Sequence, residues 1–275
     1  GLYPIELPSG IGLEASGIVE EIGEKVSLFK VGDRVSHASA PIGGYAEKQI
    51  MPEQKLVSVP DGISDEIASC ILLKGITSEY LLHRSYPAKK GDKVLFHAAA
   101  GGVGQILCQW ANAIGCEVIG TVGSNEKKDI AKKNGCHHVI NYTEKNFVEE
   151  VEKIVGKNGI DVVYDGVGKK TFEGSIECLK IRGMMVAFGN ASGYVDTIDV
   201  KKHINAKGLF FTRPSIMHYT ITRKELEESV AKVFDAILRG KVKIDISKKY
   251  KLSEVQQAHR DLENRNLTGP AVIIP

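Results

Sequence analysis

The sequence predicts an α/β protein in which a doubly wound parallel sheet is joined to a smaller β-rich unit. Three observations support this fold class. From about residue 74, apolar runs of strand length alternate with amphipathic helical runs, which is typical of right-handed βαβ units. A glycine-rich turn joins the first of these strands to the helix after it. The chain up to residue 73 is rich in glycine and proline and holds only short β-type runs, as a small β-rich unit does.

The expected elements follow one another along the chain. The first unit is expected to contain short strands at 17–23, 33–38 and 55–60. The parallel sheet is expected to contain strands at 93–98, 117–122, 137–141, 161–166 and 183–190, with a sixth at 208–211. Helices are expected at 101–115, in a lysine-rich run ending near Gly135, at 146–155, at 171–180 and at 222–242. The closing run 271–275 is β-type and is expected to return to the first unit. These elements predict a domain organisation of 1–73, 74–215 and 216–275.

The helix at 101–115 shows the pattern most clearly. Its apolar residues recur at helical spacing, and Gly115 ends it. The residues that form this apolar face are Val103, Ile106, Leu107, Trp110, Ala111 and Ile114.

Composition narrows the class of protein. The chain has 275 residues, of which 43% are hydrophobic, enough for one large domain or two modest ones. The formal net charge is +2 with acidic and basic residues interspersed, which argues against nucleic acid as a partner. The five cysteines include no C-x-x-C pair, and no apolar run reaches 18 residues. These features predict neither a disulfide framework nor a membrane span, and we expect a cytoplasmic protein.

The run 99–104, Ala-Ala-Gly-Gly-Val-Gly, matches the dinucleotide fingerprint G-x-G-x-x-G except that Ala99 stands at the first position. A strand that leads through small residues into a helix N-terminus presents free N–H groups to an anion. Gly101 would let the backbone approach a pyrophosphate, and Gly104 would let the helix pack closely on the strand. Ala at the first position requires only that the turn there avoid positive φ. Because strand, helix and later βαβ units all follow in order, we interpret this turn as a nucleotide site.

The end of the next strand indicates which nucleotide binds. An NAD site usually places an acidic residue about 20 residues past the loop, on the ribose 2′-hydroxyl. This chain instead reads Gly123, Ser124 and Asn125, with Glu126 as the first acid and Lys127 behind it. Charge-assisted hydrogen bonds to a 2′-phosphate contribute about 1.5–3 kcal/mol each, so the sequence favours NADPH. The alternative is that the lysines simply form a solvated helix face, and Glu126 fits the phosphate only if it turns outward.

Two longer stretches resemble a known family. Residues 12–35 resemble the G-x-E-x-x-G-x-V…G-D-R-V signature of the medium-chain dehydrogenase/reductase superfamily. Residues 91–111 resemble the signature of its quinone oxidoreductase (zeta-crystallin-like) family. The resemblance covers essentially the whole chain. It implies a Rossmann domain that binds NADPH, together with a GroES-like β-rich catalytic domain that is incomplete at its N-terminus. Roughly fifty residues are then expected to precede Gly1.

The resemblance also implies a zinc-free protein. Zinc-dependent relatives carry His between the Gly and Glu of the first signature, where this chain has Leu13. Catalytic zinc needs three protein ligands and an open position, and no such set is evident in the sequence. We therefore predict no metal site.

The family match assigns candidate residues to parts of the cofactor. The pyrophosphate is assigned to Gly101, Gly102, Val103 and Gly104, and the 2′-phosphate side to Gly123, Ser124, Asn125, Lys127 and Tyr142. The ribose and nicotinamide are assigned to Val167, Phe188, Gly189, Asn190, Phe211 and Arg213, with Arg265 and Asn266 closing over the cofactor. Candidates for the catalytic cleft are Lys74, Thr77 and Tyr80, for which packing is an equally weighted alternative.

The expected activity is reduction of a small quinone by NADPH without a metal, because a quinone is already electron-poor and needs mainly positioning. Two alternatives stay open at this point. The first is an NADPH-dependent reductase of enones or alkenals, and the second is an NADPH-binding protein of low turnover, crystallin-like or RNA-binding. A homodimer joined through the edge strand at 208–211 is also expected.

Overall fold

The computed structural model describes residues 5–264 and 266–275, which fall into two compact units. The first unit comprises the chain up to Ile76 with 220–240 and 244–275, and the second comprises 77–219 with 241–243. The second unit contains a six-stranded sheet in which every neighbouring pair of strands is parallel. This confirms the predicted α/β class.

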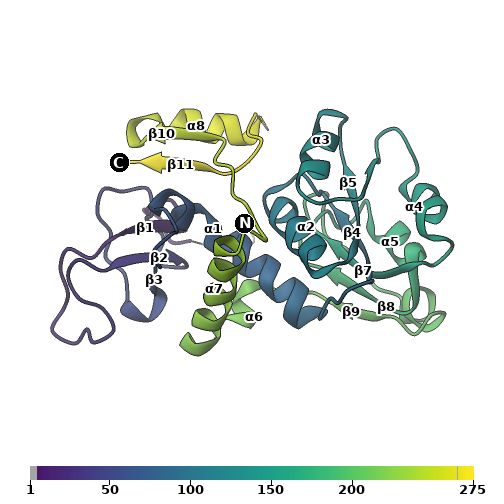
Figure 1. Ribbon diagram of the computed structural model, residues 1–275, viewed down its shortest axis with the longest axis horizontal. Helices are drawn as coiled ribbons and strands as arrows, with labels where there is room; N and C mark the ends of the chain where they lie inside the picture. Colours follow the sequence, from purple (N-terminus) through teal and green to yellow (C-terminus); the bar gives the residue numbers. More distant parts are fainter. Residues whose placement is uncertain (1–4, 265) are drawn as a thin grey trace. The chain divides into compact units, whose positions relative to one another are not determined.

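The strands of this sheet lie in the order β6-β5-β4-β7-β8-β9 (Figure 1). In chain order they are β4 (Lys93–His97), β5 (Glu117–Val122), β6 (His138–Asn141), β7 (Ile160–Asp165), β8 (Leu179–Ala187) and β9 (Phe210–Thr212). The strand of this sheet that comes first in the chain, β4, thus lies in the middle, and the order reverses between β4 and β7. In doubly wound sheets, ligands bind beyond the carboxyl ends of the strands at this reversal.

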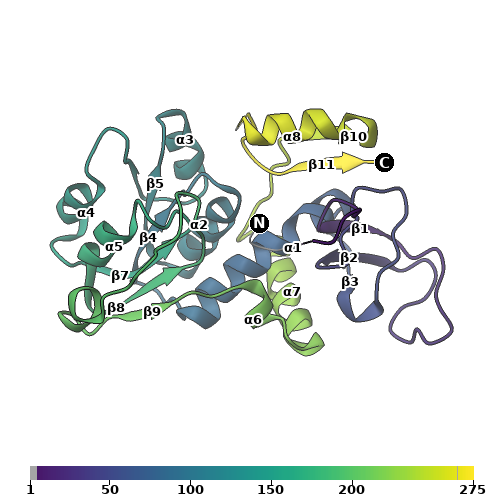
Figure 2. The same ribbon diagram turned by 180° about the vertical axis from the view of Figure 1, so that it is seen from behind.

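Helices cover both faces of the sheet (Figures 1 and 2). They are α2 (Gly102–Ile114), α3 (Glu126–Lys133), α4 (Phe147–Val155) and α5 (Phe172–Cys178). α2 contacts α3, and α4 contacts α5. The fully buried residues Leu95, Ile119 and Val163 join side chains of α4 and α5 in one apolar cluster. α2 ends at Gly115, whose φ of 96° closes the helix as predicted.

The first unit contains two small sheets. β1 (Glu14–Ile18), β2 (Arg34–Ala38) and β3 (Val57–Ser58) are antiparallel, while β10 (Lys248–Lys251) pairs in parallel with β11 (Ala271–Ile274). Its helices are α7 (Arg223–Leu238), α8 (Val255–Glu263) and most of α1 (Asp65–Tyr80). Its shorter helical turns are η1 (Glu53–Lys55) and η4 (Leu252–Glu254), and those of the second unit are η2 (Leu81–Ser85), η3 (Val200–Asn205) and α6 (Ile216–Tyr219).

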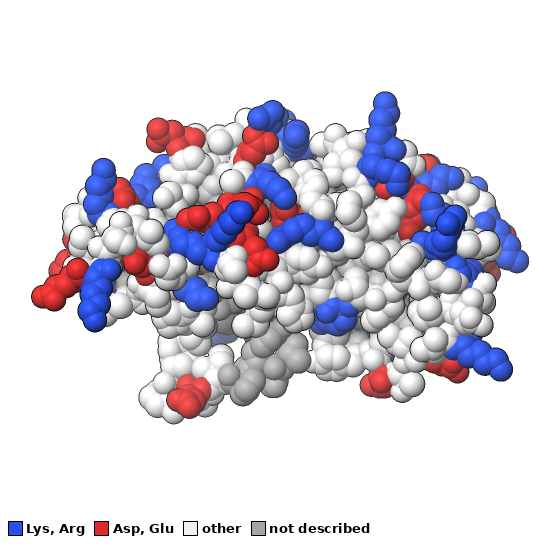
Figure 3. Space-filling model, turned by 90° about the horizontal axis from the view of Figure 1, so that it is seen from below, with Lys and Arg blue, Asp and Glu red and all other residues white. Residues whose placement is uncertain are grey.

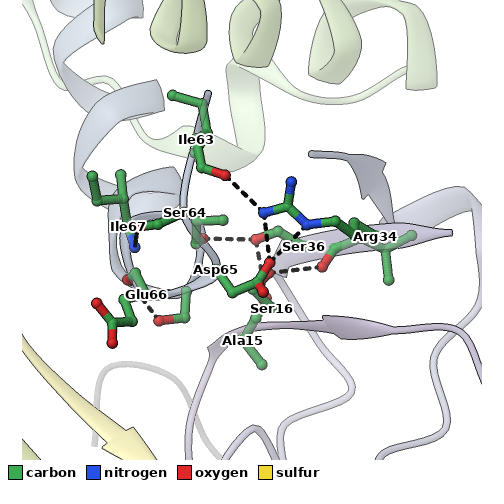
Figure 4. Close-up of polar contacts among 12 residues, drawn as sticks. Ala15, Ser16, Arg34, Ser36, Ile63, Ser64, Asp65, Glu66 and Ile67 are labelled. Atoms are coloured by element: carbon green, nitrogen blue, oxygen red, sulfur yellow. Dashed lines mark hydrogen bonds and ion pairs between the residues drawn. The ribbon is translucent and has the colours of Figure 1, made fainter. Parts of the chain in front are cut away.

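Polar contacts attach the β1–β2 hairpin to the start of α1 (Figure 4). The guanidinium of Arg34 donates to the Asp65 carboxylate at 3.0 and 2.7 Å and to the carbonyl of Ile63 at 2.7 Å. The buried hydroxyl of Ser36 donates to the carbonyl of Ala68 at 2.8 Å. Side chains of β2 therefore bind polar groups both in the turn that leads into α1 and in the first turns of that helix.

Most expected strands differ from the observed bounds, and for three of them a local reason can be given. The strand expected at 17–23 is β1. Its ladder with the next strand, β2, ends close to Gly32, which lies two residues before β2 and has a φ of +93°. The strand expected at 183–190 is β8 and stops at Ala187, because the next two N–H groups turn to the carbonyl of Asp165. The strand expected at 208–211 is β9 and starts at Phe210, because Gly208 has a left-handed φ of +57°.

Candidate functional site

The glycine-rich turn ends β4 and starts α2. Ala98 takes the positive φ of the turn, 61°, so Ala99 avoids it as predicted. The N–H of Gly101 bonds to the carbonyl of Ala98 at 2.8 Å, and α2 begins without a side-chain cap or an acidic residue in its first turn. The first N–H groups of a helix have no intrahelical acceptor. This end of α2 therefore presents donors and a positive dipole end suited to a phosphate.

Gly104 is required by the packing of α2 on the turn. A Cβ at this position would lie 2.5 Å from the carbonyl oxygen of Ala99 and 2.7 Å from that of Ala98. Both contacts are to backbone, which a side-chain rotation cannot relieve. The close approach of helix to strand that a dinucleotide fingerprint needs is thus present in this chain.

The Ala at the first position of the fingerprint is accommodated by a glycine on the next strand. Ala99 is fully buried, and its N–H bonds to the carbonyl of Thr121 on β5 at 3.0 Å. A Cβ at Gly120 would lie only 2.7 Å from the Ala99 methyl carbon. Gly120 therefore provides the space that Ala99 fills, a compensation that the motif alone does not reveal.

The turn from β5 into α3, Gly123–Asn125, lies beside Tyr142, which follows β6. A Cβ at Gly123 would lie 2.8 Å from the Tyr142 hydroxyl oxygen, so only glycine leaves this ring in place. The structure thus brings together the turn and Tyr142, two parts of the predicted 2′-phosphate site. Lys127 follows this turn in the sequence, in the first turn of α3, and is partly exposed.

Carboxylates already contact the polar groups of this turn. The Asn125 amide donates to Glu144, and the Lys128 ammonium lies 4.0 Å from the same carboxylate. The Ser124 hydroxyl hydrogen-bonds Glu126, which holds the pKa of that carboxyl below its usual value. Sequence reasoning did not identify Glu144, because it is 19 residues from its partner along the chain.

At the end of β7, the buried carboxylate of Asp165 organises the next loop. It accepts hydrogen bonds from the N–H groups of Val167 and Gly168 at 2.7 and 3.0 Å and from the Thr171 hydroxyl at 2.7 Å. Sequence reasoning did not single out Asp165. The signal was the Asp-Gly pair directly after the run Val-Val-Tyr at 162–164, which is typical of a turn.

The loops after β7 and β8 interlock. The N–H of Ser192 bonds to the carbonyl of Val167 at 2.8 Å, and a Cβ at Gly189 would lie 2.5 Å from the Gly166 carbonyl oxygen. Arg213, just after β9, donates to the carbonyl of Phe188 at 2.9 Å. The predicted ribose and nicotinamide residues of these loops are therefore brought together at one edge of the sheet: Val167, Phe188, Gly189, Asn190 and Arg213.

The other candidates for cofactor binding are Phe211, Asn266 and Arg265. The Phe211 ring contacts Phe172 edge-on, with centroids 6.2 Å apart, so it packs against α5. Asn266 belongs to the first unit, where its N–H bonds to the carbonyl of Asp261 at 2.9 Å. Arg265 is outside the described residues.

The cleft candidates lie on α1, which runs from the first unit into the second. In the first unit, the Lys74 ammonium lies 3.9 Å from the Glu14 carboxylate. Burial raises the pKa of Glu14, and Lys74 opposes that rise. In the second unit, Thr77 is buried, and the buried Tyr80 ring stacks on Tyr219 with centroids 4.5 Å apart. For Tyr80 this stacking supports the packing role that the sequence left open.

His97, the last residue of β4, lies fully buried beneath the glycine-rich turn. Its two ring nitrogens lie 2.9 Å from the hydroxyls of Thr121 and Ser175. Burial lowers its pKa, while the nearby Asp165 opposes this shift. The neutral ring thus links β4, β5 and α5 under the site.

Comparison with known proteins identifies the family. A family model described as "Zinc-binding dehydrogenase" matches residues 102–237, and one described as "Alcohol dehydrogenase GroES-like domain" matches residues 1–61. The quinone oxidoreductase of Pseudomonas aeruginosa is 43% identical over all of this chain and 85% of its own length. The structure of Escherichia coli quinone oxidoreductase complexed with NADPH superposes with a TM-score of 0.94 at 45% identity, covering 100% and 85% of the two chains.

The chain belongs to the quinone oxidoreductase family of the medium-chain dehydrogenase/reductase superfamily. This confirms the resemblance drawn from residues 12–35 and 91–111, and with it the Rossmann and GroES-like domain types. A 2-haloacrylate reductase from Burkholderia is 42% identical over 98% of this chain and 82% of its own length, so one family includes reductases named for different acceptors.

No group of three or more His, Cys, Asp or Glu side chains in the part of the chain that the structure describes is placed to hold a metal ion. None of the helices within the described ranges is both long and apolar enough to cross a membrane.

Proposed function

We propose that this quinone oxidoreductase family member transfers reducing equivalents from NADPH to a small quinone. The observation that carries the proposal is the first turn of α2, which has no side-chain cap and in which Gly104 packs closely on the preceding turn. A helix start of this kind suits the pyrophosphate of a dinucleotide. The solved structure with NADPH, 45% identical, supports the choice of cofactor.

The predicted residues then divide by the part of NADPH that they contact. Gly101, Gly102, Val103 and Gly104 hold the pyrophosphate, and Ser124, Asn125, Lys127 and Tyr142 face the 2′-phosphate. The interlocked loops after β7 and β8 support the nicotinamide half from the same edge of the sheet. When bound, NADPH supplies the hydride, and the residues of the chain orient it and exclude water.

The acceptor is chosen on chemical grounds. A zinc-dependent reductase polarises the acceptor carbonyl with a metal held by three protein ligands, and no such set gathers among residues 5–264 and 266–275. An acceptor that is already electron-poor needs no such polarisation. Quinones meet this condition, and the quinone oxidoreductases at 43–45% identity act as the precedent.

One relative supports a second candidate function. The 2-haloacrylate reductase, at 42% identity, is named for an electron-poor alkene, which fits the enone alternative left open by the sequence. Reduction of an alkene delivers a proton to carbon, whereas a quinone takes its protons on oxygen. In deuterated water, a stable label on product carbon therefore distinguishes the alkene reaction from quinone reduction.

The RNA-binding alternative has less support. On the face seen in Figure 3, Lys and Arg side chains alternate with Asp and Glu. A nucleic-acid surface is expected to gather positive charge into a patch or stripe. We therefore favour NADPH-dependent reduction over RNA binding. We further propose that the protein is cytoplasmic. Retention of RNA at moderate salt would contradict this assignment.

Edge strand β9 supports the proposed homodimer. It is the last strand of the sheet, and its Phe210 is 56% exposed. An apolar edge strand is a template for pairing with a second chain. Light scattering of wild type and Phe210→Lys checks this: a dimer that becomes monomeric supports pairing through β9, and a dimer in both contradicts it.

The experiment that tests the main proposal compares oxidation of NADPH and NADH by a small quinone and by a small enone. We expect fast oxidation of NADPH by the quinone. Lys127→Ala should raise the KM for NADPH and leave that for NADH unchanged, because only NADPH carries the 2′-phosphate. Equal effects on both cofactors would contradict the placement of that phosphate.

A further inference from the structure

Glutamates contact three of the polar groups at the β5–α3 turn. Glu144 accepts from the Asn125 amide and lies 4.0 Å from the Lys128 ammonium, while Glu126 binds the Ser124 hydroxyl. Carboxylate and phosphate are both anionic acceptors, and they take the same donors. Asn125, one of the donors expected to face a 2′-phosphate, thus already donates to one of the chain's own anions.

The orientation of Asn125 is built into the strand next to it. The buried Asn141, at the end of β6, donates to the Asn125 side-chain oxygen at 3.3 Å. The oxygen of Asn141 is in turn held by the N–H and hydroxyl of Thr143, at 3.1 and 2.8 Å. The NH₂ group of Asn125 therefore points away from Asn141, toward Glu144. Its donor face is set in advance for an anion.

We propose that Glu144 competes with the 2′-phosphate of NADPH for the donors of the β5–α3 turn and so limits the preference of this protein for NADPH over NADH. The inference rests on the proposed placement of the 2′-phosphate at this turn. Glu144 weakens NADPH binding in two ways: the phosphate must displace it from the Asn125 amide, and its charge repels a phosphate at the same place. NADH has no phosphate there and meets neither cost.

Glu126 is a second carboxylate at the same turn, and its position differs. It lies next to Lys127 in sequence and binds Ser124, so its replacement changes the hydroxyl expected to contact the ligand. Glu144 comes from the loop between β6 and α4. It can therefore be changed without altering any residue assigned to the cofactor, which makes it the better test.

The test is direct binding of NADPH and NADH, measured by calorimetry, to wild type and Glu144→Gln. Glutamine keeps an acceptor for Asn125 and removes only the charge. Since exposed ion pairs contribute little, we expect the Kd for NADPH to fall about two- to fivefold. The Kd for NADH should stay unchanged, and the gain should shrink at high salt. Glu144→Ala, which removes the acceptor as well, should bind NADPH at least as tightly.

The matched control is Glu177→Gln. Glu177 is exposed near the end of α5, just before β8 begins, and so lies at the amino edge of the parallel sheet, opposite the β5–α3 turn. It changes the net charge of the same unit by the same amount. An equal gain in this control would mean a general charge effect and would overturn the proposal.

Lys127→Ala separates the inference from the function on which it rests. If Lys127→Ala weakens NADPH binding but both Glu144 variants bind it as wild type does, Glu144 is no competitor and the site stands. If Glu144→Gln binds NADPH more weakly, Glu144 supports the site and the proposal is wrong. If Lys127→Ala leaves NADPH binding unchanged, the placement of the phosphate is itself wrong, and the inference falls with it.

Discussion

Replacement of Gly104 by alanine tests whether the first turn of α2 is the pyrophosphate site. The added methyl would lie 2.5 Å from the Ala99 carbonyl oxygen, about 1 Å closer than ordinary contact distance. Because this contact and its neighbour at 2.7 Å are both to backbone, the N-terminus of α2 must move away. Overpacking of this kind costs about 1–3 kcal/mol of the free energy of unfolding.

The same displacement should weaken nucleotide binding. Losing one N–H bond to a charged phosphate removes about 1.5–3 kcal/mol, which is roughly a ten- to hundredfold rise in Kd. NADPH and NADH share the pyrophosphate, so both should weaken equally, unlike the selective effect of Lys127→Ala. Urea unfolding and calorimetry measure the two quantities. The control is Gly23→Ala, where an added Cβ has no neighbour within 4 Å. Wild-type stability and affinity in Gly104→Ala would refute the reasoning.

Three further predictions concern the packing of the second unit. Gly120→Ala should lose about 1–3 kcal/mol of the free energy of unfolding. Adding Ala99→Gly should restore only part of this loss, since the Cys136 sulfur also lies 2.7 Å from the new Cβ, and full restoration would argue against the contact with Cys136. Burial lowers the pKa of His97 from 6.5, so the unfolded chain binds more protons than the folded one and the free energy of unfolding should fall as the pH drops below about 6.5. Urea unfolding at several pH values should show a shallower fall for His97→Gln, and the same slope in both proteins would contradict this. The Lys207 ammonium donates to three carbonyls at the end of α5 at 2.8–3.0 Å, so Lys207→Met should lose about 2–3 kcal/mol of the free energy of unfolding. Thermal or urea unfolding measures this, and an unchanged midpoint would show that water replaces the ammonium.

Local patterns were sufficient to predict the parallel sheet. The alternation of apolar strands and amphipathic helices reflects burial on both faces of the sheet, a constraint that acts on each segment separately. The turn at 99–104 was recognisable for the same reason, because the spacing of Gly101 and Gly104 is a property of consecutive residues. Strand ends were predicted less well. β9 starts after Gly208 because of a backbone angle, and β8 stops before Phe188 because of hydrogen bonds to the last residue of β7.

What the sequence by itself determined is the fold class, the family and the position of the phosphate turn, because each depends on residues close together in the chain. Tertiary structure alone decided how Ala99 is tolerated, since Gly120 lies opposite it on another strand. It also decided which donors of the β5–α3 turn are bound to carboxylates, since Glu144 reaches Asn125 from the next loop. These contacts join residues distant in sequence, and only the pairing of β4, β5 and β6 brings them within bonding distance.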